Sequence, residues 1–222
     1  MDKIFDYLLE LVLIVPTVII ALSFHECAHG FVAYKLGDPT AKYMGRVTLN
    51  PIKHLDLIGG LCMLLCRFGW AKPVPVDMRQ FRSPKRDMAI TALAGPFTNL
   101  LLGFIGCFAY SLTLKFLPGF ETRNFAFWVA YIWILFIYNF AWLNISLAIF
   151  NLIPLPPFDG SRILSAFLPD KYYLRLLSYE RYISLGFFLL LLADSRFLGG
   201  YVSSGLAYVV NGIFNGMMSL FN

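Results

Sequence analysis

Charged side chains are scarce in this sequence of 222 residues: Asp, Glu, Lys and Arg make up 14% of it, whereas hydrophobic residues make up 59%. So few charges exclude a large soluble domain. The mean hydropathy of +0.68 instead predicts an all-α polytopic membrane protein. We expect one integral membrane domain over residues 1–222, with a core at 4–168 and C-terminal helices at 179–222.

The sequence also lacks the patterns of a disulfide-bonded or nucleic-acid-binding protein. Its cysteines (Cys27, Cys62, Cys66 and Cys107) lie in apolar surroundings without the spacing of a disulfide framework. Cys62 and Cys66 could form a metal-binding pair, but buried free thiols are the favoured interpretation. No basic cluster alternates with aromatic residues, so no nucleic-acid partner is expected. The N-terminal apolar run has the length of a membrane span and is not interpreted as a cleavable signal peptide.

Histidine is rare as well, yet two of the three histidines fall in one short motif inside the first apolar run, where residues 25–29 read His-Glu-Cys-Ala-His. On a helix, His25 and His29 lie one turn apart on the same face and can bind one metal ion. Glu26 lies beside them, where a carboxylate can accept a proton from a metal-bound water. Two buried structural histidines are the alternative, but that reading leaves Glu26 without a role in apolar surroundings.

We expect about five transmembrane helices, at residues 4–35, 88–117, 125–150, 182–193 and 201–221. Pro16 should kink the first helix, and Ala94-Gly95-Pro96 should interrupt the second. The stretch at 182–193 is short for a span, so the last two helices could instead form a single one.

The connection at residues 37–86 is the polar half of the protein. Within it, the apolar stretch 57–66 is too short to span and is expected to be a re-entrant or interfacial piece. Residues 70–76 should be extended, because their prolines exclude a helix. His54, near Asp56, could be a further metal ligand, but a hydrogen-bonded loop histidine is the favoured interpretation.

Lysine and arginine are distributed unevenly, which predicts the orientation in the membrane. Residues 35–86 hold ten and residues 162–181 hold four of the eighteen. With five spans these connections lie on the same side, which the positive-inside rule makes cytoplasmic. The N-terminus is then external and the C-terminus cytoplasmic. The histidine motif and Asp159 should therefore meet at the cytoplasmic leaflet.

Asp159 is the candidate for a third metal ligand, because a catalytic zinc usually has three protein ligands and one open position. It lies in an apolar, proline-broken segment where an unpaired carboxylate is costly; an Asp-Gly turn is the alternative. Zinc lowers the pKa of bound water to about 7, so that Glu26 can accept its proton and hydroxide can attack a peptide carbonyl. Asn151 or Asn99 could donate a hydrogen bond to the substrate or the oxyanion.

Three sequence blocks together resemble the site-2 protease family of intramembrane zinc metalloproteases. They are His25-Glu26-Cys27-Ala28-His29, Ala94-Gly95-Pro96-x-x-Asn99 and Asn151-x-x-Pro154-x-x-Pro157-x-Asp159-Gly160. The phrases at residues 37–41, 45–51 and 69–75 are similar to those of compact bacterial members. Phe158 is a mild departure, because the family more often has leucine before Asp-Gly. No segment resembles the PDZ or CBS modules of some relatives.

The resemblance implies one Zn2+ per chain held by His25, His29 and Asp159, with Glu26 as the catalytic carboxylate and Asn151 near the scissile segment. The implied activity is hydrolysis of a peptide bond within the transmembrane helices of membrane-protein substrates, known as regulated intramembrane proteolysis, in a bacterial cell membrane.

The expected partners are such substrates and the lipid bilayer, and a homo-oligomer is left open. The extended residues 73–76 could pair with an unwound substrate as an edge strand. The main alternative is a membrane zinc carrier or sensor, which uses the same ligands but does not need Glu26. A catalytically inactive scaffold and hydrolysis of a non-peptide bond are further alternatives.

Overall fold

The computed structural model describes the whole chain except residues 1–2, 57–58, 60–70, 118–123, 197–199 and 222. Its elements are α1 (Lys3–Leu36), α2 (Thr40–Tyr43), η1 (Pro51–Lys53), η2 (Met78–Gln80), α4 (Pro84–Phe116), α5 (Phe125–Leu152), α6 (Asp159–Ser165), α7 (Asp170–Ser178), α8 (Glu180–Arg196) and α9 (Tyr201–Met218). Within the described residues there is no β-strand, and the one β-type contact is an isolated antiparallel bridge between Leu55 and Ala71. The predicted all-α fold is confirmed for this part of the chain.

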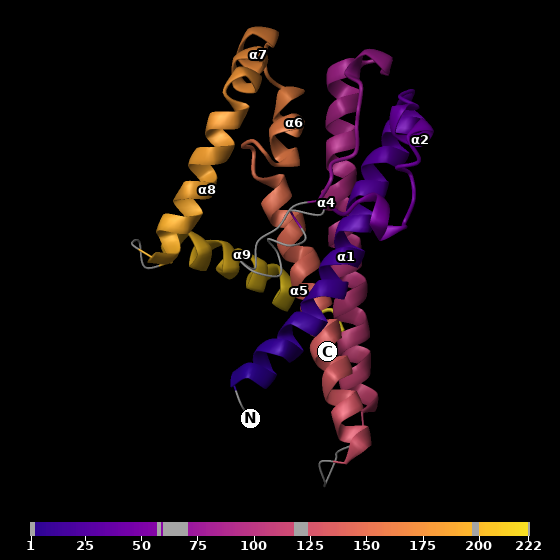
Figure 1. Cartoon of the computed structure of the whole chain (residues 1–222), viewed down its shortest axis with the longest axis vertical. Helices are drawn as coiled ribbons and strands as arrows, with labels where there is room; N and C mark the ends of the chain where they lie inside the picture. Colours follow the sequence, from indigo (N-terminus) through magenta and orange to yellow (C-terminus); the bar gives the residue numbers. More distant parts are fainter. Residues whose placement is uncertain (1–2, 57–58, 60–70, 118–123, 197–199, 222) are drawn as a thin grey trace.

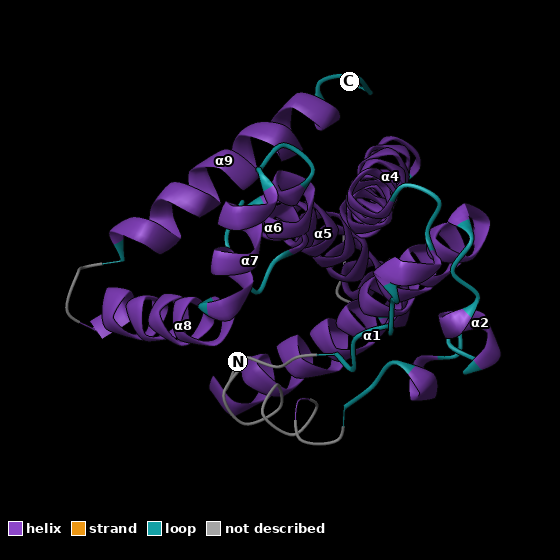
Figure 2. Cartoon of the chain, turned by 90° about the horizontal axis from the view of Figure 1, so that it is seen from above, coloured by secondary structure: helices purple, strands orange, loops and turns teal. Residues whose placement is uncertain are grey.

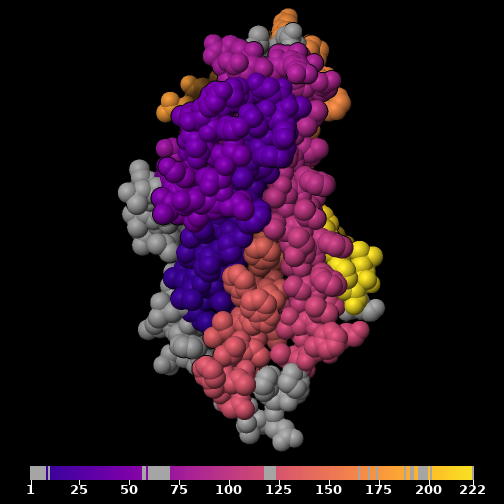
Figure 3. Space-filling model, turned by 90° about the vertical axis from the view of Figure 1, so that its right-hand side faces the viewer, coloured from indigo at the N-terminus to yellow at the C-terminus, as the bar shows by residue number. Residues whose placement is uncertain are grey.

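Three helices are long and apolar enough to cross a membrane: α1 over Leu11–Leu36, α4 and α5. Helix α1 packs against both α4 and α5. On the face shown in Figure 3, α1 lies against α4, and α5 fills the space between their lower parts. Large apolar side chains such as Phe97, Ile105 and Trp133 are exposed on these helices. Such surfaces require a lipid environment, so the protein is embedded in a membrane.

The expected count of about five spans is not confirmed. Helices α8 and α9 have 17 and 18 residues and are not among the helices apolar enough to span. Helix α8 has charged residues near both of its ends, and α9 contains several serine and asparagine residues. Asp194 of α8 is buried and accepts backbone hydrogen bonds from Val202 and Ser203, both at 2.9 Å, at the start of α9. The Asp194 carboxylate thus links the end of α8 to the start of α9 by hydrogen bonds.

The predicted interruption of the second span at Ala94-Gly95-Pro96 is wrong. Helix α4 begins earlier than expected, at Pro84, and continues through Pro96 to Phe116. A proline inside a helix removes one hydrogen bond. Pro96 is nevertheless fully buried in a helix that packs against α1, α5 and α6, and such neighbouring elements can support the backbone of a continuous helix. Pro16 similarly lies inside α1.

The polar connections gather at one end of the three long helices. Helices α2, α6 and α7 lie at the upper end of the molecule in Figure 1, opposite the N-terminus. Helix α5 ends at Leu152, and the chain then bends through the proline-rich residues 153–158 into α6, which packs on α4. The expected break in the backbone after Asn151 is therefore present, and it places Asp159 at the first position of α6. The predicted re-entrant piece at 57–66 lies almost entirely outside the described residues.

Two apolar clusters stabilise this arrangement. One joins α4, α5 and α9 and consists of Cys107, Ala141, Ile145, Val210 and Phe214. The other joins α1, α4 and the polar connection and consists of Ala33, Phe81 and Met88. Seen from above, α8 and α9 lie on the far side of α5 from α1 and α2 (Figure 2). The core around the histidine motif is therefore made by α1, α4 and α5, without α8 and α9.

Candidate metal centre

The structure brings the histidine pair and Asp159 together. His25 and His29 are buried on one face of α1, with their Nε2 atoms 3.0 Å apart. Asp159 Oδ2 lies 3.1 Å from His25 Nε2 and 3.2 Å from His29 Nε2. Among the described residues, this is the one group of three or more His, Cys, Asp or Glu side chains arranged to hold a metal ion.

The hydrogen bonds behind the imidazoles define their tautomers. His25 Nδ1 contacts Asn99 Oδ1, and His29 Nδ1 lies 2.7 Å from the carbonyl oxygen of Thr91. The Asn99 amide has this orientation because its Nδ2 donates to Asn144 Oδ1 at 2.8 Å. Since both oxygens are acceptors, each Nδ1 must carry a proton. In a neutral imidazole, Nε2 then presents a lone pair.

Three electron-rich atoms therefore meet at the centre of the site. Burial alone would raise the pKa of the Asp159 carboxyl, but positive charge at the His25 and His29 ring nitrogens outweighs burial and lowers that pKa. Asp159 Oδ2 is buried and makes no hydrogen bond. A carboxylate facing two ring nitrogens requires a positive charge between them, either a proton or a metal ion.

The dimensions of the site fit zinc. Zinc bonds to histidine nitrogen and carboxylate oxygen of about 2.0–2.2 Å in a tetrahedron place neighbouring ligand atoms about 3.3–3.6 Å apart. The three observed separations of 3.0, 3.1 and 3.2 Å are close to that spacing. Two imidazoles and one carboxylate are also the donor types of catalytic zinc sites, with one position left for water.

Glu26 lines the same hollow as the three candidate ligands. The hollow has a volume of about 170 Å³. The Oε2 atom of Glu26 accepts a hydrogen bond of 2.8 Å from the backbone N–H of Val74. Pro73, Val74 and Val76, which belong to neither a helix nor a strand, line the hollow, so this part of the polar connection borders the site.

The remaining predicted residues differ in their placement. Asn151 lines the hollow, and its Nδ2 donates to the carbonyl oxygen of Leu147 at 2.9 Å. Asn99 is fully buried behind His25 and does not line the hollow, so its contacts are with the histidine rather than with a substrate. His54 lies outside the ligand group, with Nε2 2.7 Å from the Thr48 carbonyl oxygen. Cys62 and Cys66 lie outside the described residues.

Two features of α4 at the site are absent from the predictions made from the sequence. The Thr91 carbonyl orients His29, but a backbone acceptor leaves no trace in the side-chain pattern. Gly95 lies directly against both imidazoles, because an added Cβ would be 2.4 Å from His29 Nε2 and 2.5 Å from His25 Cε1. A glycine in the middle of an apolar helix is a signal of such a close approach, as well as of a break.

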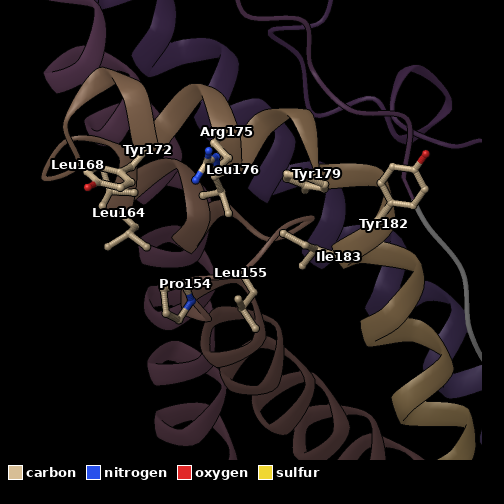
Figure 4. A pocket seen from close by; sticks show the side chains of 10 residues that line it. All are labelled: Pro154, Leu155, Leu164, Leu168, Tyr172, Arg175, Leu176, Tyr179, Tyr182 and Ile183. Carbon is tan, nitrogen blue, oxygen red and sulfur yellow. The ribbon is translucent and has the colours of Figure 1, made fainter.

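A larger hollow elsewhere in the molecule has no metal-binding chemistry. It has a volume of about 600 Å³ and lies between the proline-rich bend after α5 and helices α6, α7 and α8 (Figure 4). Its lining is mostly leucine and tyrosine, with Arg175 as its charged residue and no His, Cys, Asp or Glu. The smaller hollow therefore carries the candidate metal centre.

Comparison with known proteins agrees with this chemistry. The profile of peptidase family M50 matches residues 13–193, which include the three candidate ligands and Glu26. The chain is 42% identical over 210 residues to YwhC of Bacillus subtilis, which is named as a zinc metalloprotease, covering 91% of this chain and 89% of that protein.

Two more distant relatives carry the same kind of name. MJ0611 of Methanocaldococcus jannaschii is 32% identical, over 64% of this chain and 63% of that protein. Rip2 of Mycolicibacterium smegmatis is 28% identical, over 70% of this chain and 57% of that protein. Both are named as zinc metalloproteases. No solved structure matches the chain significantly. The chain therefore belongs to peptidase family M50, the site-2 protease family of zinc metalloproteases.

Proposed function

We propose that this protein is an intramembrane zinc endopeptidase, which hydrolyses a peptide bond within the transmembrane segments of membrane-protein substrates. The observation that carries the proposal is the approach of His25, His29 and Asp159 to within 3.2 Å of one another. Two of these residues lie in a helix that is long and apolar enough to span a membrane. Buried polar groups inside a spanning helix are costly and generally mark function.

The proposed roles follow from the contacts of each side chain. His25, His29 and Asp159 hold one Zn2+ per chain, and Asn99 and the Thr91 carbonyl keep the two imidazoles in the binding tautomer. When bound, zinc lowers the pKa of a water molecule to about 7 and polarises the scissile carbonyl.

Glu26 acts as the general base. Its Oε2 is held by the Val74 N–H, whereas its Oε1 has no hydrogen-bond partner among the described residues and is available to accept a proton from water. The same carboxyl group then donates that proton to the leaving amine. We assign Asn151, at the end of α5 and on the wall of the hollow, to bind the substrate backbone or the oxyanion.

The size of the hollow constrains the form of the substrate. About 170 Å³ holds a short piece of extended peptide but not a helix, whose diameter is about 10–12 Å. The carbonyls of a helix are also hydrogen-bonded within the helix. The substrate must therefore unwind at the scissile bond. The extended residues 73–76 remain our candidate for pairing with it, through groups other than the Val74 N–H, which Glu26 already binds.

The site is proposed to open toward the cytoplasmic leaflet. The basic connections 35–86 and 162–181 lie on the same side with three spans as well as with five, because α4 and α5 together return the chain to that side. The expected side of the site is therefore the same whatever number of spans α8 and α9 form. The presence of YwhC in Bacillus subtilis supports a bacterial cell membrane.

A membrane zinc carrier is the second candidate, since it would use the same ligands. Glu26 lines the hollow but does not belong to the group of candidate ligands. A carrier has no need of a carboxylate in such a position. The position of Glu26 favours the enzyme.

The test is cleavage of a model transmembrane peptide by the purified full chain in detergent, with the products identified by mass spectrometry. We expect both new termini to lie inside the apolar segment. Chelation should abolish cleavage, Zn2+ should restore it, and His25→Ala should lose both zinc and activity. Cuts confined to the polar flanks of the peptide would contradict intramembrane proteolysis, and zinc binding without any cleavage would favour the carrier.

A further inference from the structure

The Glu26 carboxylate is held by a backbone donor from a distant part of the chain. Val74 N–H donates to Glu26 Oε2 at 2.8 Å. Val74 lies between Pro73 and Pro75, and proline has no N–H. Val74 therefore supplies the one backbone donor of these three residues, and this donor binds Glu26. We call residues 72–77 the clamp segment.

The start of the clamp segment is fixed by Arg46. This side chain is 6% exposed, and its Nη2 donates to the carbonyl oxygen of Lys72 and, at 3.1 Å, to that of Pro73. The Lys72 N–H donates to the His54 carbonyl oxygen at 2.8 Å. Arg46 Nε is buried without a hydrogen-bond partner among the described residues. The two bonds of Nη2 come from a charged donor and are stronger than neutral ones, so the two carbonyls are firmly held. Both belong to the residues directly before Val74.

The end of the clamp segment is fixed by Asp38. Its carboxylate is fully buried and accepts hydrogen bonds from the Asp77 N–H at 2.7 Å and the Thr40 N–H at 2.9 Å. Hydrogen bonds to an ionised acceptor are stronger than neutral ones. The clamp segment is thus held on both sides of Val74 by buried charged side chains.

The surface of α1 lets the clamp segment approach. Gly30 lies one turn after Glu26 on the same face of the helix. An added Cβ on Gly30 would be 3.4 Å from Val74 Cγ1 and 3.2 Å from Val47 Cγ2, which leaves little space for a side chain. Backbone and helix therefore lie close enough for the Val74 N–H to reach the carboxylate.

We propose that Arg46 and Asp38 are positioning residues for the catalytic carboxylate, acting through the backbone N–H of Val74. The N–H holds one oxygen of Glu26 and fixes the rotation of the carboxylate, so that the other oxygen faces the hollow. The inference rests on the proposed role of Glu26 as general base. A misplacement of about 1 Å at a catalytic group can lower the rate about 100-fold.

The first test compares Val74→Pro with Val74→Ala in the purified full chain with the model transmembrane peptide. The prolines around position 74 already favour an extended backbone, so Val74→Pro should change the backbone conformation little. It removes the N–H and puts the ring Cδ in its place, so the Glu26 carboxylate loses its hydrogen bond and must move. We expect its kcat to fall about 10- to 100-fold, with KM within about threefold and zinc content unchanged. Val74→Ala keeps the N–H and loses only side-chain packing, so its kcat should fall much less.

The second test asks whether Arg46 acts through Val74. Arg46→Met should lower kcat with little change in KM or zinc content, and Arg46→Lys, which keeps a charged donor, should recover part of the rate. In the double variant Val74→Pro/Arg46→Met, kcat should be no lower than in Val74→Pro alone, because both changes act on the same hydrogen bond. A general loss of stability would instead make the two effects add.

The outcomes separate this inference from the proposed function. If the wild type cleaves, Glu26→Gln does not, and Val74→Pro cleaves as fast as Val74→Ala, the positioning role is overturned and the protease stands. If Glu26→Gln cleaves like the wild type, the proposed function fails and the inference fails with it. If Val74→Pro does not yield folded, zinc-loaded protein, the Arg46 pair decides: equal kcat in Arg46→Met and the wild type overturns the inference.

Discussion

His29 on α1 and Asp159 at the first position of α6 approach to 3.2 Å between Nε2 and Oδ2. The other nitrogen of His29 is bound to the Thr91 carbonyl oxygen at 2.7 Å, so α4 turns the imidazole toward the carboxylate. Three separate helices therefore determine one contact. Each of these helices contributes a polar group that is costly to bury without a partner. A metal ion bound between the imidazole and the carboxylate explains best why they meet.

Replacing Asp159 should remove zinc but leave the fold intact. Asp159→Asn has nearly the same shape, but a neutral amide is a poorer zinc ligand than a carboxylate. We expect zinc affinity to fall by more than about 100-fold. Metal analysis of the purified protein measures this, with Asp56→Asn as a matched control that should keep its zinc. Unaltered affinity in Asp159→Asn would send the search for the third ligand to Asp56 or His54.

Asn99 should affect zinc without touching it. Asn99→Ala removes the acceptor that orients His25, and the loss of such an outer hydrogen bond typically lowers metal affinity about 10- to 100-fold. Asn139→Ala is the control, because the Asn139 amide donates within its own helix, to the Leu135 carbonyl oxygen. Competition with a chromogenic chelator gives the two affinities. Equal values would mean that Asn99 does not support the metal centre.

Gly95 should tolerate no side chain. In Gly95→Ala the new Cβ would overlap His29 Nε2, which it would meet at 2.4 Å, so the imidazoles must move. We expect a loss of zinc and a destabilisation of about 1–3 kcal/mol. Gly205→Ala on α9 has open space around it and should be neutral or slightly stabilising. Thermal unfolding in detergent, together with zinc content, compares the two, and similar behaviour would contradict the close packing of α4 on α1.

The orientation in the membrane can be tested with reporter fusions. Fusions within 72–86 and after Ser178 should both report the cytoplasm, and a fusion in the 118–123 connection should report the outside, because positive charge is concentrated in the first two regions. We also expect an external N-terminus and a cytoplasmic C-terminus. An external C-terminus would mean that 182–221 crosses the membrane once and would leave the metal centre unchanged. Opposite locations for the first two fusions would separate Asp159 from the histidines and contradict the site.

Local spacing, the cost of burying charge and the uneven distribution of positive charge together predict the residues that the structure brings together. His25 and His29 follow from helical periodicity, and Asp159 follows from a carboxylate in apolar, proline-broken surroundings. These signals depend on a few neighbouring residues and on the solvent. They indicate which polar residues need a partner in apolar surroundings. When one membrane protein has three such residues, a common site is the simplest expectation.

Contacts made by the backbone or set by tertiary packing could not be predicted in the same way. The Val74 N–H and the Thr91 carbonyl have no side-chain signature, so their bonds to Glu26 and His29 appear only in the structure. The amide of Asn99 can bind a substrate or a histidine equally well in chemical terms, and packing decides between them. Pro96 favours a break by local propensity, which ignores the packing of α4 against α1 and α5.

In the proposed mechanism Glu26 takes a proton from water at a zinc site, and one variant tests this role most directly. Glu26→Gln has almost the same volume, leaves His25, His29 and Asp159 in place, and cannot accept a proton. We predict wild-type zinc content, undiminished binding of the transmembrane peptide, and cleavage slowed by at least about 10²- to 10⁴-fold, measured on purified protein in detergent. Cleavage at the wild-type rate with zinc bound would contradict hydrolysis at this site.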